Sequence, residues 1–281
     1  MYLTPWKKIR KTLSKNIPAE YIDILPDKWE KIGDVLIIKL PVELKKYQEN
    51  VAKEYANILR CKSVLNNTAG IEGIYREPKV EHIYGPKNTE TIHKENGIKY
   101  KLDPQKIMFS SGNMDERMRM ATISNKDEIV VDLFAGIGYF TLPIAVHSKP
   151  KKIFACEINP TAYNYLCENI VLNNVSSIVE PLEGDNKKVA PENVADRIIM
   201  GFFGGIKRFL PIAIKCLIDE KGIIHYHDKF LDKSVPDKPL KILEAVVEKN
   251  HRRLELIDYK NVKSYAPGIS HFVFDIRIGE K

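Results

Sequence analysis

The chain has 281 residues, with 44 lysine and arginine residues against 37 aspartate and glutamate residues, and a formal net charge of +7. That length is enough for one large core or two modest ones. The basic surplus suits a polyanionic partner, although it is also common in proteins that bind nothing acidic. Runs of about 18 uninterrupted apolar residues are absent, and the basic segment 1–17 is broken by polar residues, which excludes a membrane span and a signal peptide.

The four cysteines are scattered, without a Cys-x-x-Cys pair or histidines at metal-ligand spacing. This pattern predicts buried thiols in a reducing cytoplasm and no metal site. We therefore expect a cytoplasmic protein, and no obligate protein partner is evident.

The first part of the chain, residues 1–103, contains no glycine-rich nucleotide-binding turn. A strand is predicted at 34–40 and a helix at about 44–59. Apolar and polar residues alternate at 71–76 and 80–85, as in half-exposed strands. We expect residues 1–103 to form a small α+β domain that positions a substrate.

The most informative segment is 130–141, Val-Val-Asp-Leu-Phe-Ala-Gly-Ile-Gly-Tyr-Phe-Thr. An apolar run that ends in Asp132 and is followed by Gly136 and Gly138 predicts a buried strand, a turn that lets backbone approach a ligand, and a helix. Thr141 stands where the dinucleotide fingerprint has its third glycine, and an acid at the strand end would repel a pyrophosphate. Both departures favour S-adenosylmethionine over NAD, because an acid can accept a hydrogen bond from an amino group. A plain strand–turn–helix connection is the alternative for the glycine pair alone.

Two more acids follow the next two predicted strands. The strand at 152–157 ends in Glu157, about 20 residues past the glycines, where such folds place the acid that binds ribose hydroxyls. A helix is predicted from Pro160, and a strand at 178–183 leads to Asp185, an acceptor for the adenine amino group. Each acid alone is more ordinary as a solvated loop residue. Three acids at successive strand ends predict a nucleoside-type cofactor site.

The fourth predicted strand ends in Met200-Gly201-Phe202-Phe203. Amino-directed nucleic-acid methyltransferases place Asn or Asp followed by Pro-Pro-Tyr at this point, to draw protons from the target amine. Here no side chain can do so, and the aromatic surface suits a flat base that is held by stacking. Packing of both phenylalanines in the core is the alternative.

These segments resemble a known family, the class I methyltransferase-fold enzymes that modify the guanosine beside the anticodon of phenylalanine tRNA. One branch methylates N1 of that guanosine and has an Asn-x-Pro-type motif after the fourth strand. The other branch is the tRNA wybutosine-synthesising protein 2 family, archaeal aminocarboxypropyl transferases of wyosine biosynthesis. This sequence is similar to the second branch: residues 108–117 contain Phe-Ser-x-Gly-Asn in place of Phe-Ser-Pro-Arg, and the Asn-x-Pro motif is absent. The resemblance extends from about Ile17 to the C-terminus.

The resemblance implies a Rossmann-like, doubly wound α/β sheet in residues 104–281, ending in an antiparallel last strand at 269–278 and preceded by the smaller α+β domain. It also implies transfer of the 3-amino-3-carboxypropyl group of S-adenosylmethionine to C7 of 4-demethylwyosine in tRNA(Phe), with release of methylthioadenosine. Methylation of the guanosine or of a wyosine base, and cofactor-binding RNA association without turnover, are the alternatives. The nucleoside by-product distinguishes them.

The predicted site has a cofactor part and an acceptor part. By the resemblance, Ser110 and Arg117 orient the cofactor, with Arg117 paired to its methionine carboxylate; a surface arginine paired with a neighbouring acid is the alternative. We expect the following residues to bind the cofactor: Ser110, Arg117, Asp132, Phe134, Gly136, Gly138, Glu157, Asp185 and Asn186. The acceptor pocket is expected at Met200, Gly201, Phe202 and Phe203. The transfer requires little acid or base catalysis. His225 and His227 fall on one face of a predicted strand, where a structural pair is predicted and a general base is the alternative.

Overall fold

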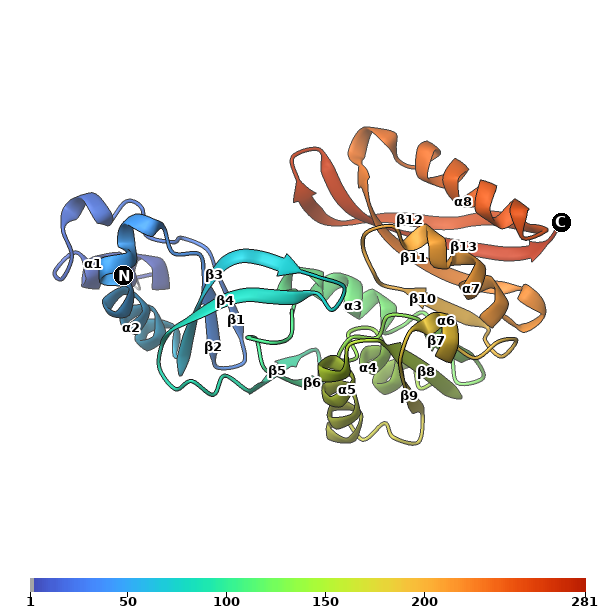
Figure 1. Cartoon of the computed structure of the whole chain (residues 1–281), viewed down its shortest axis with the longest axis horizontal. Coiled ribbons are helices and arrows are strands. Elements are labelled where there is room, and N and C mark those ends of the chain that lie inside the picture. Colours follow the sequence, from blue (N-terminus) through green and yellow to red (C-terminus); the bar gives the residue numbers. More distant parts are fainter. Residues whose placement is uncertain (1–2) are drawn as a thin grey trace. The chain divides into compact units, whose positions relative to one another are not determined.

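The computed structural model describes residues 3–281 and divides into two compact units (Figure 1). The first unit comprises the chain up to residue 95 together with residues 99–111, and the second comprises residues 96–98 and 112–281. Within the described residues, none of the helices combines the length and apolar character that crossing a membrane requires.

The first unit is a small sheet with helices packed on it. Its helices are α1 (Pro5–Leu13), η1 (Ala19–Tyr21), η2 (Val42–Tyr47) and α2 (Gln48–Leu59), and its strands are β1 (Trp29–Ile32), β2 (Val35–Ile38), β3 (Ser63–Glu72), β4 (Glu77–Tyr84), β5 (Thr91–Glu95) and β6 (Ile98–Leu102). The sheet has the order β1-β2-β3-β4, and β5 pairs with β6 in a separate ribbon. Leu13, Leu36 and Tyr55 lie in the fully buried core that α1 and α2 form with this sheet.

The predicted helix at 44–59 is confirmed as η2 followed by α2, and the predicted strand at 34–40 is β2. The prediction of a strand at 71–76 is wrong beyond Glu72. Gly73 and Arg76 have φ values of 70° and 55°, in the left-handed region, so the chain turns between β3 and β4 there. The alternation of apolar and polar residues thus extends past the end of β3 into the hairpin loop, so it did not mark where the strand ends.

The second unit alternates strands and helices along the chain. Its helices are η3 (Ser111–Asn113, at the junction with the first unit), α3 (Met114–Met120), α4 (Thr141–Pro143), η4 (Ile144–Ser148), α5 (Pro160–Leu172), α6 (Asn186–Val189), η5 (Ile206–Phe209), α7 (Leu210–Cys216), η6 (Ile218–Glu220), η7 (Asp232–Ser234) and α8 (Asp237–Lys249). Its strands are β7 (Ile129–Asp132), β8 (Lys152–Glu157), β9 (Val179–Glu183), β10 (Arg197–Met200), β11 (Gly222–Leu231), β12 (Arg252–Ala266) and β13 (Ile269–Glu280).

These strands form one sheet in the order β12-β13-β11-β10-β7-β8-β9. The five strands from β11 to β9 are parallel, whereas β13 is antiparallel to β11 and to β12. The doubly wound sheet with an antiparallel last strand is therefore confirmed. The edge strand β12 was not predicted.

The strand order reverses between β7 and β10, because β8 and β9 follow on one side of β7 and β11 on the far side of β10. In open α/β sheets, ligands bind outside the carboxyl ends of the strands at such a switch point. One face of the sheet packs its apolar residues, among them Tyr226 and Phe274, against Ile214 of α7 and Val247 of α8. The carboxyl edge near β7 and β10 is where the predicted site residues fall.

Candidate cofactor and acceptor site

The turn after β7 is closed around two glycines. Gly136 and Gly138 have φ values of 59° and 99°. A Cβ atom on Gly136 would lie 2.4 Å from the ring of Tyr139, and one on Gly138 would lie 2.6 Å from Cγ of Leu142. Both positions therefore require glycine for two reasons, backbone conformation and space. The turn brings backbone N–H groups to the carboxyl edge of the sheet.

Asp132 is the residue that holds this turn together. Its Oδ2 accepts a hydrogen bond of 2.8 Å from the Thr141 hydroxyl, and its Oδ1 accepts one of 3.1 Å from the Phe134 backbone N–H. The side chain is buried, and burial raises the pKa of Asp132 to about 6. Thr141, which replaces the third glycine of the dinucleotide fingerprint, thus links the start of α4 to the end of β7.

Glu157 links the tip of β8 to the same turn. Its Oε2 accepts a hydrogen bond of 2.7 Å from the Gly136 N–H, and its Oε1 accepts one of 2.7 Å from the Asn159 N–H. The residue is half-buried, and desolvation raises its pKa despite these bonds. The carboxylate is held at a fixed place at the edge of the sheet and remains partly exposed, as a contact with ribose hydroxyls requires.

The third strand tip provides a short helix and an unpartnered amide oxygen. Asp185 caps α6 by accepting a 3.1 Å hydrogen bond from the Lys187 N–H. Asn186 is buried and donates a 2.8 Å hydrogen bond from Nδ2 to the Leu133 carbonyl oxygen. Its Oδ1 is buried and has no hydrogen-bond partner among residues 3–281. The hydrogen bond to Leu133 thereby connects the end of β9 to the end of β7, and the Oδ1 atom of Asn186 remains as an available acceptor.

Aromatic rings line the other side of the switch point. Phe202 stacks on Phe134, with ring centroids 5.2 Å apart and ring planes 17° apart, and Phe209 meets Phe134 edge-on at 5.0 Å. A Cβ on Gly201 would lie 2.8 Å from the ring of Phe140, so this segment runs close to the glycine turn. The aromatic residue of one strand tip therefore packs directly on that of the next.

The structure separates the four residues predicted for the acceptor pocket. Phe202 and Phe203 are half-buried at the end of β10, whereas Met200 is completely buried in the core with Ile198 and Tyr226. All four residues of β10 are buried, Met200 among them, and its expected role in lining the acceptor pocket stays a prediction.

Arg117 lies on α3 and is 2% exposed, which excludes the alternative of a surface arginine. The neighbouring Glu116 is bound instead by Arg119, with nitrogen–oxygen distances of 2.7 and 2.9 Å. Ser110 is half-buried and belongs to the first unit. Its predicted contact with the cofactor stays a prediction.

A buried polar network beneath α3 was not predicted. Arg119 donates to Asp275 at 2.6 Å, and Asp275 accepts from His225 at 2.6 Å. These partners hold the pKa of Asp275 well below its usual value, against the opposing effect of burial. The second histidine, His227, is joined to His271 of β13 at 3.1 Å. The two groups on β13, Asp275 and His271, were missed because they lie between 44 and 156 positions from their partners, a separation that no local pattern reveals.

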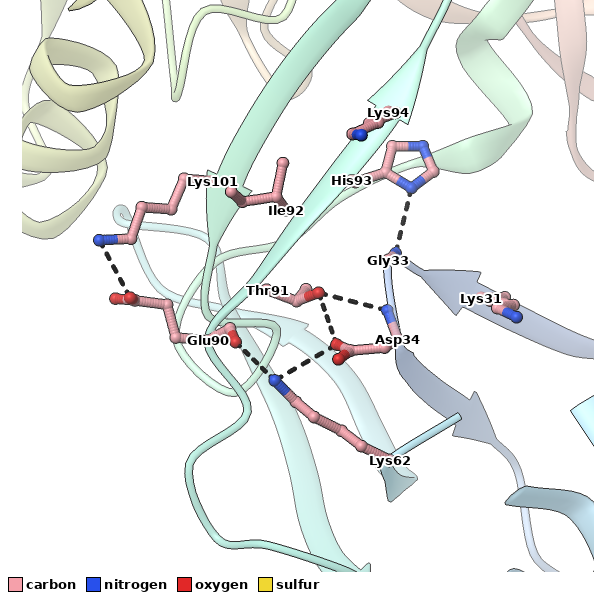
Figure 2. Close-up of a pocket in the computed structure, with 10 residues that line it drawn as sticks. All are labelled: Lys31, Gly33, Asp34, Lys62, Glu90, Thr91, Ile92, His93, Lys94 and Lys101. Atoms are coloured by element: carbon pink, nitrogen blue, oxygen red, sulfur yellow. Dashed lines mark hydrogen bonds and ion pairs between the residues drawn. The ribbon is translucent and has the colours of Figure 1, made fainter. Parts of the chain in front are cut away.

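A separate pocket lies within the first unit and was not predicted (Figure 2). Lys62 spans it, with its Nζ 2.8 Å from the carbonyl oxygen of Glu90 and 3.3 Å from Oδ1 of Asp34. Lys101 pairs with the Glu90 carboxylate at 3.0 Å. The acids of this pocket are therefore neutralised by its own lysines. Groups of histidine, cysteine and acidic side chains that could hold a metal ion are absent from the described residues.

Two family models match the chain. The TRM5/TYW2 methyltransferase domain matches residues 91–256, and the TYW2 N-terminal domain matches residues 9–89. The chain belongs to the TRM5/TYW2 family. The resemblance inferred from the sequence is thereby confirmed.

Several archaeal members of this family have similar sequences. The Methanocaldococcus jannaschii protein named tRNA(Phe) (4-demethylwyosine(37)-C(7)) aminocarboxypropyltransferase is 46% identical over 250 residues, which cover 89% of this chain and 97% of that protein. The Pyrococcus horikoshii protein of the same name is 42% identical over 271 residues, which cover 96% of each chain. A methylating member, tRNA (guanine(37)-N(1))-methyltransferase Trm5b of Pyrococcus abyssi, is 37% identical, covering 94% of this chain and 78% of that one.

Solved structures of this family agree in fold. The P. horikoshii TYW2 structure in complex with MeSAdo matches with a TM-score of 0.88 and 40% identity, covering 98% of this chain and 100% of that one. The M. jannaschii TYW2 structure in complex with AdoMet matches with a TM-score of 0.74 and 42% identity, covering 90% and 100%.

Proposed function

We propose that this protein transfers the 3-amino-3-carboxypropyl group of S-adenosylmethionine to C7 of 4-demethylwyosine at position 37 of tRNA(Phe), releasing methylthioadenosine. Two archaeal relatives that match nearly the whole chain bear the name of this activity. The structural observation that supports it best is the end of β10, where stacked Phe202 and Phe134 replace the proton-accepting side chain of an amino-directed methyltransferase.

The chemistry depends on which carbon of the sulfonium meets the base. Attack by the π electrons at C7 on the γ-carbon of the methionine arm forms the new C–C bond and breaks the γ-carbon–sulfur bond. The released electron pair stays on sulfur, which leaves as a neutral thioether, and the base then loses its C7 proton. A pocket that orients the arm toward the base therefore selects this transfer over methylation.

The chain's own residues provide such an orientation. In this proposal Arg117, buried on α3, binds the methionine carboxylate through charge-assisted hydrogen bonds. Glu157 accepts hydrogen bonds from the ribose hydroxyls, and Asp185 and the unpartnered Oδ1 of Asn186 accept from the nucleoside end. Asp132 acts indirectly, since its two oxygens hold the turn that carries Phe134.

We assign tRNA positioning to residues 1–103 and catalysis to residues 104–281, with the anticodon region as the part of the tRNA that is bound. The N-terminal helix α1 supports this assignment, because Lys7, Lys8 and Lys11 are exposed on it. Phosphate binding by such groups releases counterions, so affinity for tRNA should fall steeply with salt concentration. An affinity that does not change with salt would contradict it. We propose that the reaction takes place in the cytoplasm and that no membrane takes part in it.

The decisive experiment uses S-adenosylmethionine labelled separately in the methyl group and in the carboxyl group, with tRNA that contains 4-demethylwyosine. Carboxyl label in tRNA together with methyl label in methylthioadenosine is the expected result. Methyl label in tRNA would instead establish the second candidate function, that of a methyltransferase. The 37% identity to the P. abyssi methyltransferase is the observation that favours this second candidate. If the protein binds the cofactor but transfers neither label to tRNA, the result would indicate an RNA-binding protein that binds the cofactor without turnover.

A further inference from the structure

A pair of buried histidines borders the acceptor segment, residues 201–205, and has no part in the function described so far. His227 of β11 and His271 of β13 are each 1% exposed, and their Nδ1 and Nε2 atoms lie 3.1 Å apart. The ring of Phe203 meets His271 edge-on with centroids 4.6 Å apart, and Phe140 stacks on His227 at 5.0 Å. The pair is thus enclosed by an aromatic ring from the acceptor segment and another from the glycine turn.

The neighbours of the pair decide where its protons lie. Glu116 receives hydrogen bonds from two nitrogens of Arg119 and is therefore an ionised acceptor. Its Oε1 lies 3.8 Å from Nε2 of His227, which is buried and has no hydrogen-bond partner among residues 3–281; the carboxylate is too far away for a hydrogen bond, but its negative charge favours the tautomer with the proton on this nitrogen. Nδ1 of His227 is then an acceptor and receives the hydrogen bond from Nε2–H of His271. Nδ1 of His271 is consequently left with a lone pair.

That lone pair has no hydrogen-bond partner among residues 3–281, although the atom is buried. Buried polar atoms are nearly always paired, and an exception in a site calls for a functional explanation. Phe203, whose ring meets His271, precedes Gly204 and Gly205, whose φ values are 98° and 78°, and nothing lies within 4 Å of a Cβ built on either. Access of a substrate to His271 would require the Phe203 ring to move aside, and the two glycines that follow it allow the backbone to change conformation.

We propose that His271 is the base that removes the C7 proton of the acceptor, with His227 and Glu116 stabilising the charge that it gains. This inference rests on the proposed function. After C7 has bonded to the γ-carbon, the ring is cationic; the C7–H bond breaks, its electron pair restores the aromatic ring, and the proton is bound by Nδ1 of His271. The resulting imidazolium is compensated through His227 by the Glu116 carboxylate.

The surroundings keep His271 neutral and ready to accept. Burial, with a further effect from the positive charge of Lys263, lowers the pKa of His271 to about 3, and burial and the neighbouring histidines lower the pKa of His227 well below its usual value. A weak base is sufficient here, because a C–H bond on a cationic aromatic ring is a strong acid. The proposal thus adds a proton acceptor to a reaction whose leaving group needs none.

The test compares His271→Gln with the intact protein, using tRNA whose acceptor has deuterium at C7. We expect transfer to slow by about a hundredfold or more and a primary isotope effect to appear, with cofactor affinity unchanged. The matched control is His225→Gln: His225 lies on the same face of β11, but its two nitrogens are engaged by Asp275 at 2.6 Å and Arg197 at 2.8 Å. Any slowing by this control should come without an isotope effect.

The proposal is overturned if His271→Gln transfers at the normal rate, or transfers slowly without an isotope effect. A second measurement needs no substitution. Nitrogen-15 NMR of the full chain should show His271 protonated at Nε2 and unprotonated at Nδ1, and the opposite tautomer would also overturn the proposal. Failure of the intact protein to transfer carboxyl label, by contrast, would count against the proposed function itself.

Discussion

The carboxyl ends of β7, β8 and β9 differ sharply from those of β10 and β11. On the first side, Asp132 and Glu157 are bound to backbone N–H groups of one close-packed turn. On the second side, Phe202 and Phe203 are followed by Gly204 and Gly205, which have open space beside them. The difference suits their proposed ligands: a nucleoside with many polar groups needs acceptors at fixed positions, whereas a flat base needs apolar rings and room to enter.

The largest expected effect is a difference in unfolding free energy between alanine substitutions at two glycines that share a backbone conformation. Gly138 and Gly204 have φ values of 99° and 98°, so alanine costs about 1 to 3 kcal/mol of backbone strain at either. At Gly138 the new Cβ also overlaps Leu142, which adds about 1 to 3 kcal/mol. Urea unfolding of Gly138→Ala should therefore show a larger loss of unfolding free energy than that of Gly204→Ala. Equal losses would mean that the two strand ends are equally close-packed.

The next effect concerns the acids. Glu157→Ala should weaken S-adenosylmethionine binding by about 1.5 to 3 kcal/mol, because a charged hydrogen-bond acceptor is removed. Calorimetric titration measures the change. Glu183→Ala is the matched control, since Glu183 is an exposed glutamate at the end of the adjacent strand, paired in register with Glu157. An unchanged dissociation constant for a folded Glu157→Ala protein would remove Glu157 from the site.

On the aromatic side, Phe202→Ala should weaken the acceptor step by about 1 to 3 kcal/mol, the contribution of stacking to one base. The specificity constant for tRNA measures this, and calorimetry with the cofactor should show a smaller change. Phe202→Leu is the control that keeps apolar volume without an aromatic face. If the leucine variant is as active as the original protein, stacking is not what Phe202 contributes.

The last effect, small per pH unit, is a pH dependence of stability. His271 has a pKa of about 3 in the folded protein and about 6.5 when unfolded, so the unfolded chain gains a proton first as the pH falls below 6.5. Its contribution to stability is therefore lost between these values, by about 1.4 kcal/mol per pH unit. Asp132, whose pKa is raised to about 6 in the folded protein, contributes in the opposite direction, because its contribution to stability grows as the pH falls. This contribution is the same in the original protein and in the His271 variant. The test is thus the difference between the original protein and His271→Gln, whose stability should fall less with acid; parallel curves would contradict it.

The sequence by itself determined the fold and three of the strand ends. Gly136, Gly138 and Glu157 were recognisable because a tight turn and the acid that follows it have a fixed spacing along the chain. The antiparallel last strand and the helix from Pro160 were likewise found where predicted. These features depend on residues close together in sequence, where periodicity and turn chemistry are informative.

Only the tertiary structure decided which side chains are buried and which distant residues meet. Arg117 looked equally suited to a surface ion pair until α3 was seen to bury it, and the complete burial of Met200 at the end of β10 was likewise visible only in the structure. The contact between His227 and His271 depends on β13 lying beside β11, with 44 residues between the two histidines. Burial and long-range pairing follow from how whole elements pack, which the spacing of residues along one segment does not specify.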